Sequence, residues 1–163
     1  MKPADFARVA ALAKKFPGRV VPAFGVHPWF AEEWNADAEK LLRERLDEAP
    51  AGDVAVGEIG LDRCRGNDDA QEAAFRTQLA LAAKLRVPAT VHCVRAFGKT
   101  ESVMREFSAA GTLPPILLHA YGGSPEQARV FARLGDVFFS APRRPLPPEC
   151  PLVPESDAPL QGS

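Results

Sequence analysis

The sequence predicts an α/β fold built on a parallel sheet or barrel. Apolar segments of strand type alternate with helical segments at intervals of about 25 to 35 residues, a rhythm typical of parallel strands joined by right-handed crossovers. Several of the apolar segments in the 163-residue chain also end in a carboxylate or a histidine. Because the ends of parallel strands share one edge, and that edge carries the active site of a barrel, we expect these side chains to meet.

Two helices and two strands are expected in the first part of the chain. Residues 4–15 have apolar side chains at helical spacing, and a Pro-Gly pair ends the helix. Residues 19–26 read as a strand. The segment 37–46 is amphipathic, with leucines on one side and charged residues on the other. The next strand runs up to Glu58.

The alternation continues through the second part of the chain. Residues 69–85 carry Ala and Leu at a helical period among Arg, Gln and Lys, and residues 99–110 are also helical. Ser124 and Pro125 open a further helix, because serine is a favoured cap and proline fits the first helical position. Strands are expected between these helices at 87–92, 116–119 and 137–140.

Composition describes an ordinary globular chain. Hydrophobic residues make up 46% and charged residues 25%, and the net charge is -1. One domain is expected at this length, and the charge gives no broad basic surface for nucleic acid. A phosphate-rich partner would therefore be held locally.

Several features indicate a cytoplasmic protein with no membrane partner. No apolar run approaches the roughly 18 residues of a membrane span, and no apolar signal region follows Met1. The three cysteines, Cys64, Cys93 and Cys150, are odd in number and lack the pair spacing of a metal site. We therefore expect free thiols in a reducing compartment. The oligomeric state is left open.

Glu58 is the residue around which the predicted site is organised. It follows an apolar run and lies between Gly57 and Gly60. A strand buried on both faces is continuously apolar, so a charge is expected only where the strand stops. The glycines allow a sharp bend and the close approach of another group. A plain surface turn is the alternative interpretation.

Two histidines support a metal site over that alternative. His92 and His119 are each the last residue of a predicted strand, so both converge with Glu58 on one edge. A lone histidine of this kind is more often structural. Two neutral imidazoles and a carboxylate, however, make a usual catalytic ligand set that leaves positions open for water and substrate. Imidazole suits Zn²⁺, whereas carboxylate and water suit Mg²⁺ or Mn²⁺.

A series of motifs follows in a fixed order along the chain. The motifs are Gly25-Val26-His27-Pro28, Gly57 to Asp62, Gln71 to Phe75 with Gln78-Leu79, Pro88 to His92, Leu118-His119, and Glu155 to Pro159. In this order they resemble the TatD family of metal-dependent deoxyribonucleases, from about residue 16 to residue 159. Residues 24–29 and 92–98 look closest to the plant-like branch of that family.

The resemblance implies a TIM barrel that hydrolyses phosphodiester bonds of nucleic acid, DNA more than RNA, with one or two divalent ions of Mg, Mn or Zn. It implies that Glu58 is both catalytic and a bridging metal ligand, that His92 and His119 bind one metal, and that Asp157 binds the other. The implied chemistry is in-line attack of metal-activated water on phosphorus. Asp157 would orient or deprotonate that water, although its surroundings are also an ordinary turn sequence.

The chain also departs from the family pattern. It contains no His-x-His pair, which family members carry at the end of the first strand. The resemblance implies a single domain over 1–163, truncated at the N-terminus by two strands and abbreviated at the C-terminus, where the last helices are lacking. About six of the eight barrel strands remain. A non-catalytic remnant and a related amidohydrolase-like deacylase therefore stand as alternative functions.

Four further residues are candidates for substrate contact. His27 precedes a proline at a strand end, where structural and substrate-binding roles are equally supported. Arg95 lies three residues past His92 and could face a phosphate, because a guanidinium group matches phosphate oxygens. Trp29 and Phe30 could stack on a base, although aromatic residues after a strand more often pack in the core or a loop. Cys93 should point away from His92 by strand alternation.

Overall fold

Six parallel strands form one sheet in the order in which they follow along the chain. The computed structural model describes residues 1–49 and 53–154. The order is β1-β2-β3-β4-β5-β6, and all five neighbouring pairs are parallel. The strands are β1 Ala23–Phe24, β2 Ala55–Asp62, β3 Ala89–Val94, β4 Ile116–Leu118, β5 Val137–Ser140 and β6 Leu152–Val153. This unreversed order is that of a barrel wall, and within the described residues β1 and β6 do not pair to close it. The predicted α/β fold with parallel strands is confirmed.

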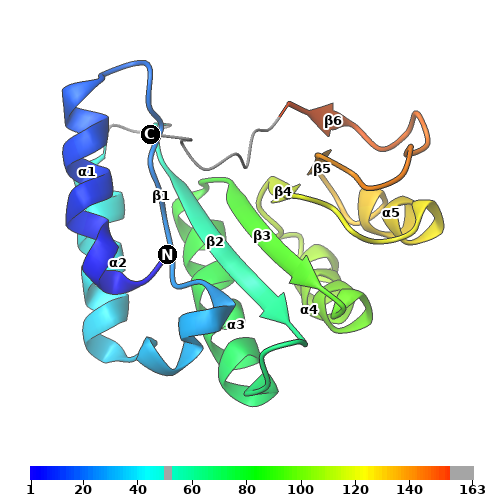
Figure 1. The fold of residues 1–163 in the computed structure, drawn as a ribbon, viewed down its shortest axis with the longest axis horizontal. Coiled ribbons are helices and arrows are strands. Elements are labelled where there is room, and N and C mark those ends of the chain that lie inside the picture. Colours follow the sequence, from blue (N-terminus) through cyan, green and yellow to red (C-terminus); the bar gives the residue numbers. More distant parts are fainter. Residues whose placement is uncertain (50–52, 155–163) are drawn as a thin grey trace, which may run out of the picture.

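Helices cover one side of this sheet (Figure 1). They are η1 Pro3–Asp5, α1 Phe6–Lys15, η2 Pro28–Glu33, α2 Ala36–Glu48, α3 Asp68–Leu85, α4 Phe97–Ala109 and α5 Pro125–Ala132. The predicted serine cap of α5 is confirmed, because the Ser124 side chain accepts a hydrogen bond from the Gln127 N–H. Within residues 1–49 and 53–154, none of the helices has the length and apolar character that crossing a membrane requires.

The core lies between the sheet and these helices. On β2, Ile59 and Leu61 are buried against α3, which contributes Phe75 and Leu79. On β3, the residues at alternate positions are buried in the pattern that a strand with one packed face requires. The residues between them, including His92, point to the opposite face, which leaves that face free for polar side chains.

Two predicted strand boundaries on the site face are wrong. Glu58 does not end its strand, because β2 continues to Asp62 and keeps pairing with β3 up to Val94. His92 likewise lies two residues before the end of β3. A charge is tolerated inside these strands because only one of their faces is packed with apolar side chains, whereas the prediction assumed that both are.

The first strand is also shorter than predicted. Residues 19–26 were expected to be extended in a ladder, but only Ala23 and Phe24 pair with β2. The backbone of Val26 instead exchanges two hydrogen bonds with the side chain of Gln78 on α3. The chain therefore leaves the ladder early because a helix side chain replaces the neighbouring strand.

Candidate metal centre

All three histidines of the chain gather around Glu58. The Glu58 Oε2 atom lies 3.1 Å from His119 Nε2, 3.4 Å from His27 Nε2 and 3.7 Å from His92 Nδ1. The four side chains come from β2, β3 and the segments that follow β1 and β4. The Glu58 side chain is 34% exposed, so this group of ligand atoms is accessible from solvent.

A β-bulge in β2 aims Glu58 at the histidines. Between Val56 and Ile59 the strand advances three residues, while its partner β3 advances two, from Ala89 to Val91. The extra residue changes the face to which the following side chains point, as bulges near active sites commonly do. As a result Ile59 packs in the core and Glu58 faces the histidines.

Gly60 makes room for His92 between two carboxylates. These two residues are direct partners across β2 and β3. Side chains two apart on a strand share a face, so Glu58 and Asp62 flank Gly60 on the site face. A Cβ atom at Gly60, where φ is +133°, would lie 2.1 Å from the His92 carbonyl oxygen. The glycine is therefore required for the close approach that puts the His92 ring between both acids.

Asp62 fixes the protonation of the His92 ring. Its Oδ2 atom lies 3.3 Å from His92 Nε2, so the Nε2–H donates to the carboxylate. In a neutral ring this leaves a lone pair on Nδ1, the atom that faces Glu58 and His27 Nε2. A carboxylate that holds the outer nitrogen of a histidine is the arrangement found behind metal-ligating histidines. His92 is thus prepared for metal binding through Nδ1.

His27 has the opposite arrangement. Its Nδ1 atom accepts a hydrogen bond of 3.2 Å from the backbone N–H of Trp29. A neutral His27 ring therefore carries its proton on Nε2, the atom that points to Glu58 and His92. His27, Glu58 and His92 have ligand atoms within 4.8 Å of one another, so distance alone would admit His27 as a ligand. The hydrogen bond from Trp29 makes it a donor instead.

Two buried glutamines of α3 hold the backbone on which the site is built. Gln71 accepts from the Asp62 N–H at 2.7 Å and donates to the Asp62 carbonyl oxygen at 3.1 Å. Seven residues later on the helix, Gln78 makes the same pair of bonds to Val26, one residue before His27. Both glutamines are buried. The helix thereby positions the segments that carry His27 and Asp62 relative to each other.

Electrostatics keep the two carboxylates ionised. Burial raises the pKa of Glu58, but the neighbouring side chains of His119, His27 and His92 outweigh it and hold that pKa far below its usual range. Burial also raises the pKa of Asp62, and the Trp29 indole N–H together with other donors lowers it below its ordinary value. For His27, burial is the largest effect and lowers the pKa, which favours the neutral ring. Negative charge is therefore available at the centre.

The geometry fits a divalent ion. Ligand atoms about 2.1 Å from a tetrahedral ion lie about 3.4 Å from each other. The distances from Glu58 Oε2 to His119 Nε2 and to His92 Nδ1, 3.1 and 3.7 Å, bracket that value. One carboxylate and two imidazoles also leave coordination positions for water and substrate. Both distances to Glu58 therefore suit a shared divalent ion.

The remaining predicted site residues lie elsewhere. Arg95 lines a cavity of about 550 Å³ between α3 and α4, together with Lys99 and Asp68, and none of the four central side chains lines that cavity. Asp157 lies outside the described residues. Cys93 points away from His92 as predicted, because its thiol is buried against Thr100 and burial raises its pKa to about 11.

Three residues that support the site were not predicted from the sequence. Asp62, Gln71 and Gln78 occur in the motifs, but no role was given to them. The glutamines had a visible signal, since two amides seven residues apart lie on the apolar face of a predicted helix. Their partners are backbone groups of distant strands, which periodicity does not reveal.

The sequence matches the family model described as TatD related DNase over residues 1–144. A protein of Edwardsiella piscicida described as "3'-5' ssDNA/RNA exonuclease TatD" is 36% identical over 174 residues, covering 95% of this chain and 64% of its own. A protein of Pantoea ananatis with the same description is 36% identical over 113 residues, covering 68% of this chain and 42% of its own. The chain thus spans less than two thirds of the length of these relatives.

Solved structures agree with the sequence matches. The crystal structure of a TatD homologue from Escherichia coli superposes with a TM-score of 0.72 and 31% identity, covering 86% of this chain and 53% of that one. A TatD family hydrolase from Entamoeba histolytica superposes with a TM-score of 0.65 and, at 23% identity, supports the fold alone. The six-stranded sheet is accordingly part of a TIM-barrel architecture, as expected. The plant-like affinity stays a prediction. By sequence and by structure, the chain belongs to the TatD related DNase family.

Proposed function

We propose that the intact protein is a divalent-metal-dependent hydrolase that cleaves phosphodiester bonds of nucleic acid. The observation that carries this proposal is the convergence of His92 and His119 on Glu58, with the outer nitrogen of His92 held by Asp62. Relatives described as ssDNA/RNA exonucleases support nucleic acid as the substrate class. Single-stranded DNA is the substrate that we expect first.

The proposed ligands are Glu58 Oε2, His92 Nδ1 and His119 Nε2. A bound divalent ion would polarise a phosphoryl oxygen and lower the pKa of a water molecule towards about 7. The Glu58 carboxylate would neutralise part of the charge of the ion. The hydrogen bond to Asp62 keeps the lone pair of His92 Nδ1 directed at the same ion. Asp157 remains a proposed further ligand and the group that would orient the attacking water.

His27 has a separate proposed role in binding substrate. Its Nε2–H points into the group of ligand atoms, 3.4 Å from Glu58 Oε2. With a phosphodiester bound there, that proton can be donated to a non-bridging phosphoryl oxygen and stabilise the charge that develops during attack. The backbone N–H of Trp29 keeps the proton on the correct nitrogen. Arg95 stays a proposed contact for a more distant phosphate.

Titration calorimetry with Mn²⁺ tests the ligand set. We expect wild type to bind Mn²⁺ and His119→Ala to lose at least about tenfold in affinity, because one of three protein ligands is removed. Glu44→Gln is the matched control, since it removes an exposed carboxylate of α2 that lies outside the centre. Equal Mn²⁺ affinity in wild type and His119→Ala would contradict the assignment.

Hydrolysis tests the reaction itself. A 3′-labelled single-stranded oligodeoxynucleotide is incubated with the intact protein and Mn²⁺, with and without chelator. We expect cleavage that chelator abolishes and that Glu58→Gln reduces by at least about a hundredfold, because the central carboxylate is lost. Cleavage that persists in chelator would rule out the metal-dependent mechanism, and Mn²⁺ binding without any cleavage would favour the non-catalytic alternative.

A further inference from the structure

Trp29 is an exposed aromatic residue that is nevertheless held in place. Half of its surface, 50%, is accessible to solvent. Its indole Nε1–H donates to Asp62 Oδ2 at 2.6 Å, and its backbone N–H donates to His27. A large ring fixed by two hydrogen bonds loses little conformational entropy when it binds a partner. Core packing, the commoner role for such a residue, therefore does not account for its position.

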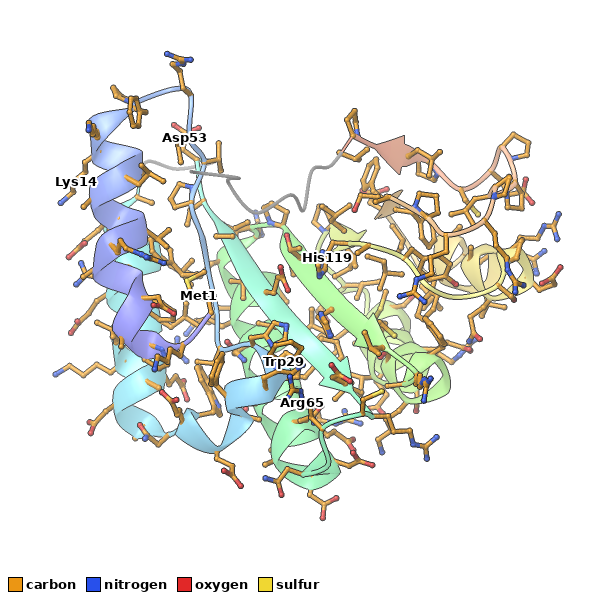
Figure 2. All side chains as sticks on the ribbon, in the orientation of Figure 1. Met1, Lys14, Trp29, Asp53, Arg65 and His119 are labelled. Atoms are coloured by element: carbon orange, nitrogen blue, oxygen red, sulfur yellow. The ribbon has the colours of Figure 1, made fainter. Side chains whose placement is uncertain are left out.

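Arg65 lies over the Trp29 ring. The guanidinium carbon is 3.9 Å from the ring centroid, and Figure 2 shows the two side chains together beside the end of β2. Arg65 is exposed, and no carboxylate of the described residues forms an ion pair with it. Its N–H groups are thus available to an anion, while the flat guanidinium extends the aromatic surface. The pair offers both a stacking surface and a positive charge.

This surface adjoins the proposed centre. The ring centroids of Trp29 and His27 are 5.1 Å apart. A phosphate next to His27 would therefore carry its nucleoside within reach of Trp29. Bases stack on aromatic rings and on arginine planes regardless of sequence, which is the mode by which single strands are commonly bound.

We propose that Trp29 and Arg65 form a stacking platform for a nucleobase adjacent to the cleaved phosphodiester. The platform rests on the proposed function, because it requires a single-stranded nucleic acid at the centre. Base and guanidinium stack with the indole, and the guanidinium N–H groups bind the neighbouring phosphate. Trp29 has a second, structural role through Asp62, so the test must separate the ring from its N–H group.

Two substitutions of Trp29 make that separation. Trp29→Phe keeps an aromatic face and loses the indole N–H, whereas Trp29→Leu loses both. The readout is binding of a labelled oligothymidylate of about 8 nucleotides, measured by anisotropy in chelator, relative to an abasic strand of the same length. Wild type should prefer the base-containing strand by roughly 5- to 100-fold. Trp29→Phe should keep most of that preference and Trp29→Leu should lose most of it.

Phe16 and Lys15 supply the matched control. Phe16 is also exposed and lies under a cation, the Lys15 ammonium at 5.5 Å, but at the end of α1. Phe16→Leu should leave the preference unchanged. Arg65→Ala should weaken binding of both strands and reduce the slope of log affinity against log salt by about 0.7, because one phosphate contact is lost. An equal preference in Trp29→Phe and Trp29→Leu would overturn the platform.

Fluorescence gives a readout that is independent of cleavage. In a Trp34→Phe background Trp29 is the sole tryptophan, and stacking should quench its emission. Quenching without hydrolysis would reject the proposed hydrolase and keep the platform. Hydrolysis without quenching, with the preference intact in Trp29→Leu, would reject the platform and keep the hydrolase. Absence of binding by either strand in chelator would overturn the platform.

Discussion

Two neighbouring regions of the sheet are stabilised by different interactions. At β2 and β3 the site face carries acids and histidines, and buried amides hold the backbone behind them. At β4 and β5 the strands are short, and the neighbouring helix and loop pack aromatic rings. The first region is fixed by hydrogen bonds and the second by apolar burial.

Tyr121 is the centre of the aromatic region. Its ring lies 5.0 Å from Phe139, 5.8 Å from Phe97 and 6.4 Å from Phe131, in edge-to-face arrangements. Its one polar group, the hydroxyl, donates to the Ser124 carbonyl oxygen. A region of this kind stabilises the fold but does not position a charged group of the site. Substitutions in it should therefore change the free energy of unfolding and leave metal binding unchanged.

The comparison separates stability from function within one sheet. Near Glu58, each polar group has a directed partner, and a lost partner redirects a proton or a lone pair. Near Tyr121, contacts are not directional, and a lost ring leaves a cavity. Substitutions in the two regions should therefore give different experimental signatures.

The largest expected effect comes from the aromatic region. Phe139→Ala should lower the free energy of unfolding by about 3 to 5 kcal/mol, because the ring is fully buried and its removal leaves a cavity. Mn²⁺ affinity of the folded protein should stay within about threefold of wild type. Urea denaturation and calorimetry measure the two quantities. Phe138→Ala is the control, since its ring is 37% exposed and should cost at most about 1.5 kcal/mol. A large loss of Mn²⁺ affinity in folded Phe139→Ala would show that the aromatic region also contributes to metal binding.

Gly60→Ala should affect both quantities, with an intermediate loss of stability. The added Cβ would lie 2.1 Å from the His92 carbonyl oxygen, at a φ of +133° that other residues rarely adopt. We expect the free energy of unfolding to fall by about 3 kcal/mol and Mn²⁺ binding to weaken, because β2 and His92 must move apart. Gly98→Ala is the control, since nothing lies within 4 Å of its added Cβ and helix α4 should gain up to about 1 kcal/mol. Similar results for both variants would show that the close approach is dispensable.

Periodicity was sufficient to predict the alternation of helices and strands. Helix 69–85 and strand 137–140 differ from α3 and β5 by at most one residue at each end. Periodicity gave the wrong position for Glu58. This residue was placed at a strand end because a charge was taken to mark the end of a strand. In the structure a bulge and an open face allow the strand to continue. A bulge depends on pairing with another strand, which a local pattern does not contain.

The site was predicted in part for a similar reason. Glu58, His92 and His119 were expected to converge, and the structure brings them together. The donor role of His27 depends on one backbone N–H, and the support from Gln71 and Gln78 depends on strands far away in sequence. Residue type revealed the chemistry, whereas tautomers and supporting hydrogen bonds required the fold.

The smallest expected effect tests the hydrogen bond behind His92. Asp62→Asn should lower Mn²⁺ affinity by about 10- to 100-fold, because outer carboxylates orient and strengthen histidine ligands. The Cys64 N–H requires an acceptor at the Oδ1 position, so the new amide NH₂ would face His92 Nε2 and favour a proton on Nδ1, the ligand atom. The Trp29 indole N–H would then also lose its acceptor, but the free energy of unfolding should still change less than in Phe139→Ala, since no cavity is formed.

Trp29→Phe is the control for this substitution. It removes the other donor to Asp62 Oδ2, the indole N–H, and leaves the carboxylate in place. If the carboxylate acts through His92, then Asp62→Asn weakens Mn²⁺ binding much more than Trp29→Phe does. Equal losses of Mn²⁺ affinity in the two variants would mean that Asp62 serves to anchor η2 through Trp29. The hydrogen bonds that orient metal ligands would then be confined to Glu58 and the three histidines.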